Sequence, residues 1–113
     1  MSTLTKEFLS ASTNGRGIKI AATATAGTLL HTAHASAKDK VWVYLSNTSA
    51  SDVVASIEFG GTTSPDDIVK VTVPAAKTIL AIPGLIVSGG LAVRCFAAAA
   101  NVLSAFGEVD RLA

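Results

Sequence analysis

Hydrophobic and polar residues alternate along most of the chain, and the clearest case is the stretch from Val41 to Gly61. It opens with VWVYL, whose β-branched, aromatic and bulky side chains suit the pleated surface of a strand. Small and mostly turn-forming residues follow at 46–52, and alternation resumes over 53–59. This pattern predicts a β-hairpin whose loop is longer than the tight two-residue kind.

Similar alternating segments lie on both sides of this stretch, separated by turn signals such as GGTTSPDD at 60–67 and PGL at 83–85. Gly107 interrupts the last segment and is expected to form a bulge. No segment predicts a helix long enough for a parallel crossover. About eight short strands at this spacing predict an antiparallel β-sandwich or barrel. The further expected strands are 18–28, 28–35, 68–73, 77–82, 91–96 and 102–109.

Residues 1–17 differ from the rest because they are rich in Ser and Thr and carry two glycines near their end. A short helix over Leu4–Ser10 would be marginal on its own. We therefore expect an N-terminal arm at 1–17, which orders on contact with a neighbouring molecule or remains a frayed tail, and a β-sandwich domain at 18–113.

The composition combines 50% hydrophobic residues with only 15% charged residues, against the roughly 25% charged residues of typical soluble domains. A sparsely charged surface on a small domain is poorly protected against association. We infer that copies of the chain or another protein cover part of this surface. The alternative is an alanine-rich monomer with a neutral, hydroxyl-rich surface, since alanine is readily left exposed.

The net charge is +1, and the nine basic residues are scattered rather than clustered. The sequence therefore predicts neither a nucleic-acid groove nor a polybasic membrane patch. The longest apolar region, 71–93, is broken by prolines, glycines and a lysine, so no membrane helix is expected. Lys6 and Glu7 stand where a signal peptide needs apolar residues, so secretion by that route is not expected either.

The only histidines are His31 and His34, and Asp39 is the acidic residue closest to them. On a helix this spacing would place both rings on one face, but on a strand it places them on opposite faces. No further ligand completes a zinc site within one chain, although several copies around a symmetry axis would supply more. Cys95 is the only cysteine and is expected to be a small buried hydrophobic residue.

Asp66 and Asp67 lie in the 60–67 loop, whose hydroxyl and carboxylate oxygens are suited to a cation. Their spacing does not match a calcium loop, and a Pro-Asp-Asp turn is ordinarily only a turn. The glycine pairs precede no phosphate-binding helix, and the chain contains no nucleophile elbow. We therefore predict a non-enzymatic protein with no cofactor and name no catalytic or metal-binding residue.

Trp42 and Tyr44 lie two residues apart and therefore on one face of their predicted strand. If exposed, their rings would stack on a sugar, as in a carbohydrate-binding module. If buried, they would be core or interface anchors. Because aromatic residues make up only 5% of the chain, we favour the core or a subunit interface.

Several segments of strand and turn resemble the small β-sandwich proteins that decorate or cement the heads of tailed bacteriophages. The resemblance covers roughly Arg16 to Leu112 and lies in scaffold patterns rather than in catalytic signatures. The segments that carry it are GTLLHTA (27–33), VWVYLSNTS (41–49), IEFGGTTSPDD (57–67), VTVPA (71–75), IPGLIVSGGLAVRCFA (82–97) and NVLSAFGEVDRL (101–112).

The resemblance implies a virion structural protein, often trimeric, that binds the major capsid protein and reinforces the shell. Such a protein is made in the host cytoplasm and resides on the capsid surface. Under this hypothesis the N-terminal arm bridges to the capsid or to a neighbouring copy, so deletion of residues 1–16 weakens particle binding and leaves the domain folded. A head–tail connector or tail protein and a carbohydrate-binding module remain as alternatives.

Overall fold

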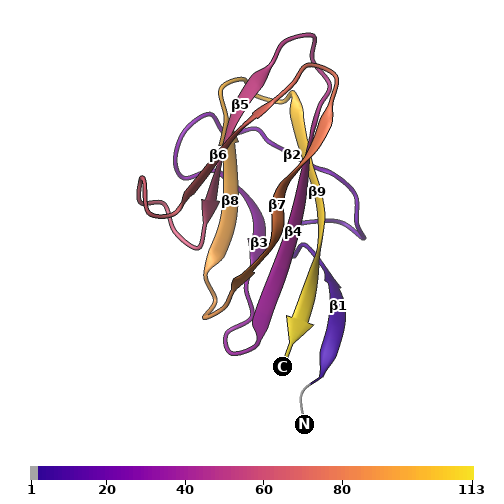
Figure 1. The fold of residues 1–113 in the computed structure, drawn as a ribbon, viewed down its shortest axis with the longest axis vertical. Helices are drawn as coiled ribbons and strands as arrows, with labels where there is room; N and C mark the ends of the chain where they lie inside the picture. Colours follow the sequence, from indigo (N-terminus) through magenta and orange to yellow (C-terminus); the bar gives the residue numbers. More distant parts are fainter. Residues whose placement is uncertain (1–2) are drawn as a thin grey trace.

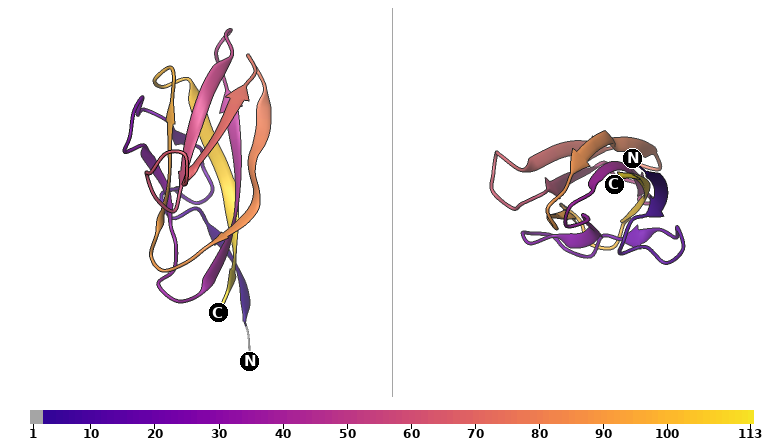
Figure 2. Two further views of the ribbon diagram at one scale, coloured as in Figure 1. Left: turned by 60° about the vertical axis from the view of Figure 1, so that its left-hand side comes forward. Right: turned by 90° about the horizontal axis from the view of Figure 1, so that it is seen from below.

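Two antiparallel sheets pack face to face in the computed structural model, which describes residues 3–113. These residues form nine strands and no helix, and the strands run along the long axis of the molecule (Figure 1). The two sheets have separate hydrogen-bonded ladders. Figure 2 shows the same ribbon from two further directions. The prediction of an all-β antiparallel fold is confirmed, and of its two forms the structure has the sandwich.

The larger sheet has the order β1-β9-β4-β7, and β2 pairs with β9 beside β1. The smaller sheet has the order β3-β8-β5-β6. Strands of the larger sheet are β1 (Leu4–Phe8), β2 (Ile18–Lys19), β4 (Lys38–Asn47), β7 (Thr78–Val87) and β9 (Leu103–Leu112). Strands of the smaller sheet are β3 (Thr28–Thr32), β5 (Val53–Phe59), β6 (Ile68–Val73) and β8 (Ala92–Ala97).

The core lies between the sheets and is built from one side-chain face of each long strand. On β4, Val41, Val43 and Leu45 are fully buried, while the residues between them are at least partly exposed. From the other sheet, Ile57 and Val93 join the same cluster. Period-two alternation therefore sorts each strand into a core face and an outer face, as strand geometry requires.

The stretch 41–61 is not a hairpin, and that prediction was wrong. β4 pairs with β7 and β9, whereas β5 pairs with β6 and β8, so the intervening loop crosses from one sheet to the other. The buried side chain of Asn47 holds the crossing, because its Nδ2 donates to the carbonyls of Ser51 (2.8 Å) and Val73 (3.0 Å). Two alternating strands with a small polar loop fit a crossing between sheets as well as a hairpin, since both arrangements bury one face of each strand.

The PGL turn expected at 83–85 is also absent, because β7 continues through Pro83. Its pairing with β4 shifts register twice, between Val41 and Trp42 and between Val43 and Tyr44. β7 is an edge strand with one partner, so a residue without an N–H costs no second ladder bond there. The two irregularities let the strand pass through proline without ending.

The N-terminal segment is neither a helix nor a separate arm over its described residues. Leu4–Phe8 forms β1, which pairs along the end of β9, and Leu9 is buried in the core. β9 extends to Leu112, and without β1 the backbone groups on its edge away from β4 would be unpaired there. The expected boundary at residue 17 thus falls inside the sandwich, and residues 1–2 of the expected arm lie outside the described residues.

Gly107 is not a bulge, because the β4–β9 register is continuous from Lys38 to Asn47. A Cβ on Gly107 would lie 2.0 Å from the carbonyl oxygen of Trp42. The glycine therefore permits close approach of two backbones, the other common reason for glycine within a strand.

Candidate functional site

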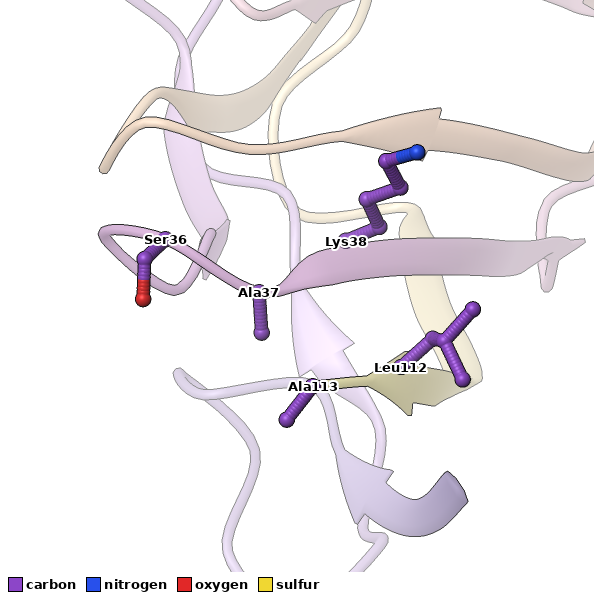
Figure 3. Close-up of a pocket in the computed structure, with 5 residues that line it drawn as sticks. All are labelled: Ser36, Ala37, Lys38, Leu112 and Ala113. Carbon is purple, nitrogen blue, oxygen red and sulfur yellow. The ribbon is translucent and has the colours of Figure 1, made fainter. Parts of the chain in front are cut away.

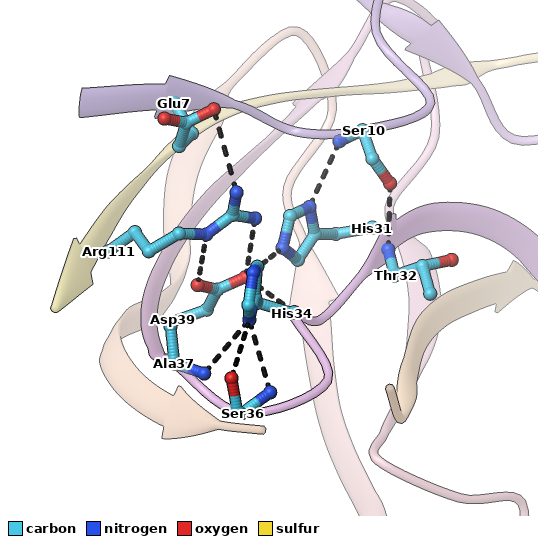
Figure 4. Close-up of polar contacts among 9 residues, drawn as sticks. All are labelled: Glu7, Ser10, His31, Thr32, His34, Ser36, Ala37, Asp39 and Arg111. Carbon is cyan, nitrogen blue, oxygen red and sulfur yellow. Dashed lines mark hydrogen bonds and ion pairs between the residues drawn. The ribbon is translucent and has the colours of Figure 1, made fainter. Parts of the chain in front are cut away.

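Asp39 on β4 is the centre of a buried polar network that joins the two sheets (Figure 4). Arg111 on β9 donates from Nε to Oδ1 (2.8 Å) and from a terminal nitrogen to Oδ2 (3.1 Å). His31 on β3, in the opposite sheet, lies 2.8 Å from the same Oδ2 through its Nε2. The carboxylate is fully buried, so these contacts replace the water it would otherwise require.

The pKa of Asp39 is lowered by this network. Burial by itself would raise it, but the hydrogen bonds from Arg111, from His31 and from the His34 backbone outweigh burial and lower the pKa to about 2. Asp39 is therefore ionised over the whole range of ordinary working pH. It serves as the anionic anchor of the network rather than as a proton carrier near neutrality.

Both ring nitrogens of His31 are occupied within the protein. The Ser10 backbone N–H donates to Nδ1 (3.0 Å), which assigns the proton to Nε2 and makes Asp39 its acceptor. The Ser10 hydroxyl instead accepts from the Thr32 backbone N–H. Since His31 is 1% exposed and Ser10 Oγ does not face it, this Ser–His–Asp set cannot operate as a catalytic triad.

His34 differs from His31 in its surroundings, because the strand expected over 28–35 ends at Thr32, before His34. It follows β3, is exposed, and accepts hydrogen bonds at Nδ1 from the backbone N–H groups of Ser36 and Ala37. Within residues 3–113, no three His, Cys, Asp or Glu side chains come together in a group that could hold a metal ion. The two histidines therefore belong to no such group within these residues.

The 60–67 loop is closed by its own backbone and by Asp67. The Asp67 carboxylate accepts a hydrogen bond from the backbone N–H of Thr63 (3.1 Å). The backbone N–H of Asp67 in turn donates to the Thr63 carbonyl (2.8 Å). The same carboxylate lies close against Gly61, where a Cβ would have to displace it. Asp67 thus stabilises the turn, while Asp66 is exposed and makes no hydrogen bond within the described chain.

Exposed hydrophobic side chains are concentrated on the larger sheet. Among residues 3–113, eight of the ten large hydrophobic side chains that are exposed belong to its strands. Alternation and register place most of them, with the half-buried Trp42, on the side that faces away from the core. We call this surface the outer apolar face and define it by Leu4, Phe8, Trp42, Tyr44, Leu80, Ile86, Phe106 and Leu112.

One end of the outer apolar face is a row across three strands. Phe106 on β9, Tyr44 on β4 and Leu80 on β7 are register partners, and each is 42% exposed. The Phe106 ring also packs over Gly17, where a Cβ would lie 2.7 Å from it. Such a row of aromatic and aliphatic side chains on a small domain is typical of a surface that another molecule covers.

Charged residues lie beside this row rather than within it. Lys6 donates to Asp110 (2.6 Å), and this hydrogen bond lowers the pKa of the Asp110 carboxyl. Lys40 and Ile86 continue across the sheet from Asp110 in register. This charged row therefore crosses the outer apolar face between the Phe106–Tyr44–Leu80 row and the Leu4–Leu112 pair at the other end.

Trp42 lies flat against β7 rather than standing free. A Cβ on Gly84 would lie 2.9 Å from its ring, and the Lys40 ammonium lies 5.5 Å from the ring centroid. Its Nε1 is buried and has no hydrogen-bond partner among the described residues. The prediction that Trp42 and Tyr44 share one face is confirmed, and that face is outside the core.

A hollow of about 320 Å³ opens at the end of the sandwich where β9 finishes (Figure 3). Its lining includes Ser36, Ala37, Lys38 and Leu112, and the Lys38 side chain extends away from Ala37 and Ala113. No side-chain carboxylate or imidazole faces this hollow. Its chemistry gives no acid–base pair, so it is not a candidate active site.

The chain matches no protein-family model, no curated protein and no solved structure. Residues 3–113 contain no helix with the length and hydrophobicity needed to cross a membrane. The interpretation of the site therefore depends on its own residues.

Sequence reasoning missed two features of this site. Phe106 alternates with the core residues Leu103, Ala105 and Val109, so the pattern of β9 already placed it on the outer side. The Asp39–Arg111 pair had no such signal, because 72 residues separate the two and only the β4–β9 register brings them together.

Proposed function

We propose that the chain is a non-enzymatic structural protein of a tailed-bacteriophage virion, which binds the major capsid protein and reinforces the head. The observation that supports this most is the outer apolar face, with Phe106, Tyr44 and Leu80 exposed in one row. The choice of partner rests on the resemblance of the strand and turn segments to head decoration proteins.

Covering such a face removes apolar surface from water, which favours association of a small domain with another protein. Aromatic side chains carry a large share of interface energy, and a flat row of them on a sheet suits docking onto another protein. Lys40, Asp110 and Glu108 lie between apolar side chains of this face and supply charges that orient the contact. We propose that copies associate as a homo-oligomer, with a trimer favoured, on the capsid surface after synthesis in the host cytoplasm.

Electron microscopy and mass spectrometry of particles of the encoding phage test this proposal. We expect the chain in purified particles, at regular positions on the outside of the head. Its confinement to a ring at the head–tail junction or to the tail would instead favour the connector or tail alternative. Its absence from particles would contradict both.

A carbohydrate-binding module is the second candidate, and the exposure of Tyr44 favours it. Sugar stacking needs a free aromatic face, however, and Gly84 and Lys40 already pack against the Trp42 ring. Glycan binding that disappears on Trp42→Ala would support the module. Unchanged glycan binding in that variant would exclude this face as its sugar site.

A further inference from the structure

A second hollow, of about 280 Å³, lies on the outer side of the smaller sheet. Its floor is a cross-strand row in which Ser56 on β5 has Phe96 on β8 and Lys70 on β6 as register partners. Residues 23–25 form one wall, and Thr62 and Ser64 contribute to another. An aromatic ring, an amine and loop side chains thus surround one concave site on the sheet opposite the outer apolar face.

Half of the residues that line this hollow bear a hydroxyl group, and they lie among apolar side chains such as Ile68 and Phe96. Ser56 is only 5% exposed, and its residual exposure is toward the hollow that it lines. Within residues 3–113 its hydroxyl is not among the buried side-chain atoms that lack a partner, so solvent or a ligand in the hollow can reach it. The hydroxyl-bearing residues of the lining are Thr23, Thr25, Ser56, Thr62 and Ser64.

One wall of the hollow is fixed by a buried carboxylate. Glu58 is 1% exposed, and its Oε1 accepts the Gly27 backbone N–H (2.7 Å) while its Oε2 accepts the Thr25 hydroxyl. Arg94 adds a hydrogen bond to the Gly27 carbonyl (3.2 Å). These bonds hold the 23–27 segment against the sheet, so the concave shape exists before any ligand arrives.

The charges around the hollow indicate the class of ligand. Lys70 alone would favour an anion, but the Glu58 carboxylate lies in the same lining and offsets the ammonium. A phosphate or sulfate would approach that buried carboxylate at an electrostatic cost. A neutral ligand with several hydroxyl groups matches the lining without this cost.

We propose that this hollow binds a neutral polyhydroxylated ligand of the monosaccharide class. The sugar ring lies over Phe96, and its hydroxyls bond to Ser56, Lys70 and the threonines of the walls. This inference goes beyond the proposed virion role and does not depend on it. If the outer apolar face docks on a shell, the hollow points away from the shell and stays accessible.

Titration of the ¹⁵N-labelled chain followed by NMR tests the proposal, with glucose, galactose, mannose and N-acetylglucosamine as probes and inorganic phosphate for comparison. We expect at least one sugar to give saturable shifts at Ser56, Lys70 and the 23–25 and 62–64 loops, with a Kd in roughly the millimolar range. Phe96→Ala should weaken that binding about tenfold.

Two further variants keep this result interpretable. Ser56→Ala removes a lining hydroxyl for which the structure shows no hydrogen bond within residues 3–113, so it should preserve the fold and weaken sugar binding. Thr72→Ala changes an exposed residue of β6 outside the lining and should bind as the unmodified chain does. The proposal is overturned if no sugar gives saturable shifts, if the shifts centre on Tyr44, if phosphate binds in preference to every sugar, or if Ser56→Ala binds unchanged.

Discussion

At the scale of single residues, Asp39 shows how one buried charge is made stable. Its carboxylate takes hydrogen bonds from three different parts of the chain, which together reverse the effect of burial on its pKa. Removing one member of such a network leaves the others without partners, which is usually costly. The network is thus a brace between β3, β4 and β9, at the end of the sandwich near the termini.

Asp39→Asn should lower the free energy of unfolding at pH 7 by about 2 kcal/mol. This is the stabilisation that corresponds to a carboxyl pKa lowered from 3.8 to about 2 on folding. Because the folded-state pKa is the lower one, this stability is complete above about pH 4 and is lost as the pH falls toward 2. Thermal unfolding followed by circular dichroism from pH 7 to 2 measures both effects.

The matched control for this experiment is Asp110→Asn on β9, which removes the partner of the exposed Lys6 ammonium. Exposed ion pairs contribute little, so its unfolding temperature should hardly change. An Asp39→Asn variant as stable as the control at pH 7 would contradict the structural role of the network.

Cys95 should be inert in the folded protein. It is fully buried, and burial together with the negative charge of Glu58 raises the pKa of its thiol to about 12. A thiol reagent needs both access and the thiolate. We expect no labelling by iodoacetamide at pH 8 until denaturant is added, and rapid labelling of the native chain would show that β8 is not packed as described.

At the scale of elements, β1 is where the structure departs most from expectation. Its pairing with β9 is completed by backbone hydrogen bonds between Thr3 and Ala113 in both directions (3.1 and 2.9 Å). The segment that follows contributes Leu9 to the core. The N-terminal segment is therefore part of the sandwich, and deleting residues 1–16 would remove structure as well as any contact with a partner.

Leu9→Ala should destabilise the fold by about 2–5 kcal/mol, because it leaves a cavity in a closely packed core. Chemical denaturation followed by tryptophan fluorescence measures this, since Trp42 is the only tryptophan. Leu4→Ala, an exposed leucine of β1, is the matched control and should have a much smaller effect. Equal losses in the two variants would contradict the burial of Leu9.

The sequence pattern predicted most strands but not how they pair. Alternation located β4, β5, β6, β8 and β9 because their inner faces are regular, whereas β1 lacks a buried alternate face and gave no such signal. The hairpin was predicted wrongly because local pattern does not specify which sheet a strand joins. Trp42 and Tyr44 were located on one face from spacing alone, but their exposure depends on the whole sheet.

At the scale of the whole molecule, the two outer faces of the sandwich differ. The larger sheet carries the row of Phe106, Tyr44 and Leu80, and the smaller sheet carries a concave site lined with hydroxyl groups. A protein that attaches by one face and presents the other would have this asymmetry. The small share of charged residues fits the same arrangement, since a covered face has less need of charge.

The most direct test of the docking claim is co-sedimentation of the chain with heads of the encoding phage that lack it. The unmodified chain and Thr72→Lys, an exposed change on the smaller sheet, should sediment with the heads. The double variant Tyr44→Lys with Phe106→Lys should remain folded and lose binding at least tenfold, because both changes place charge in an apolar interface. Undiminished binding of the folded double variant would contradict the role of the outer apolar face.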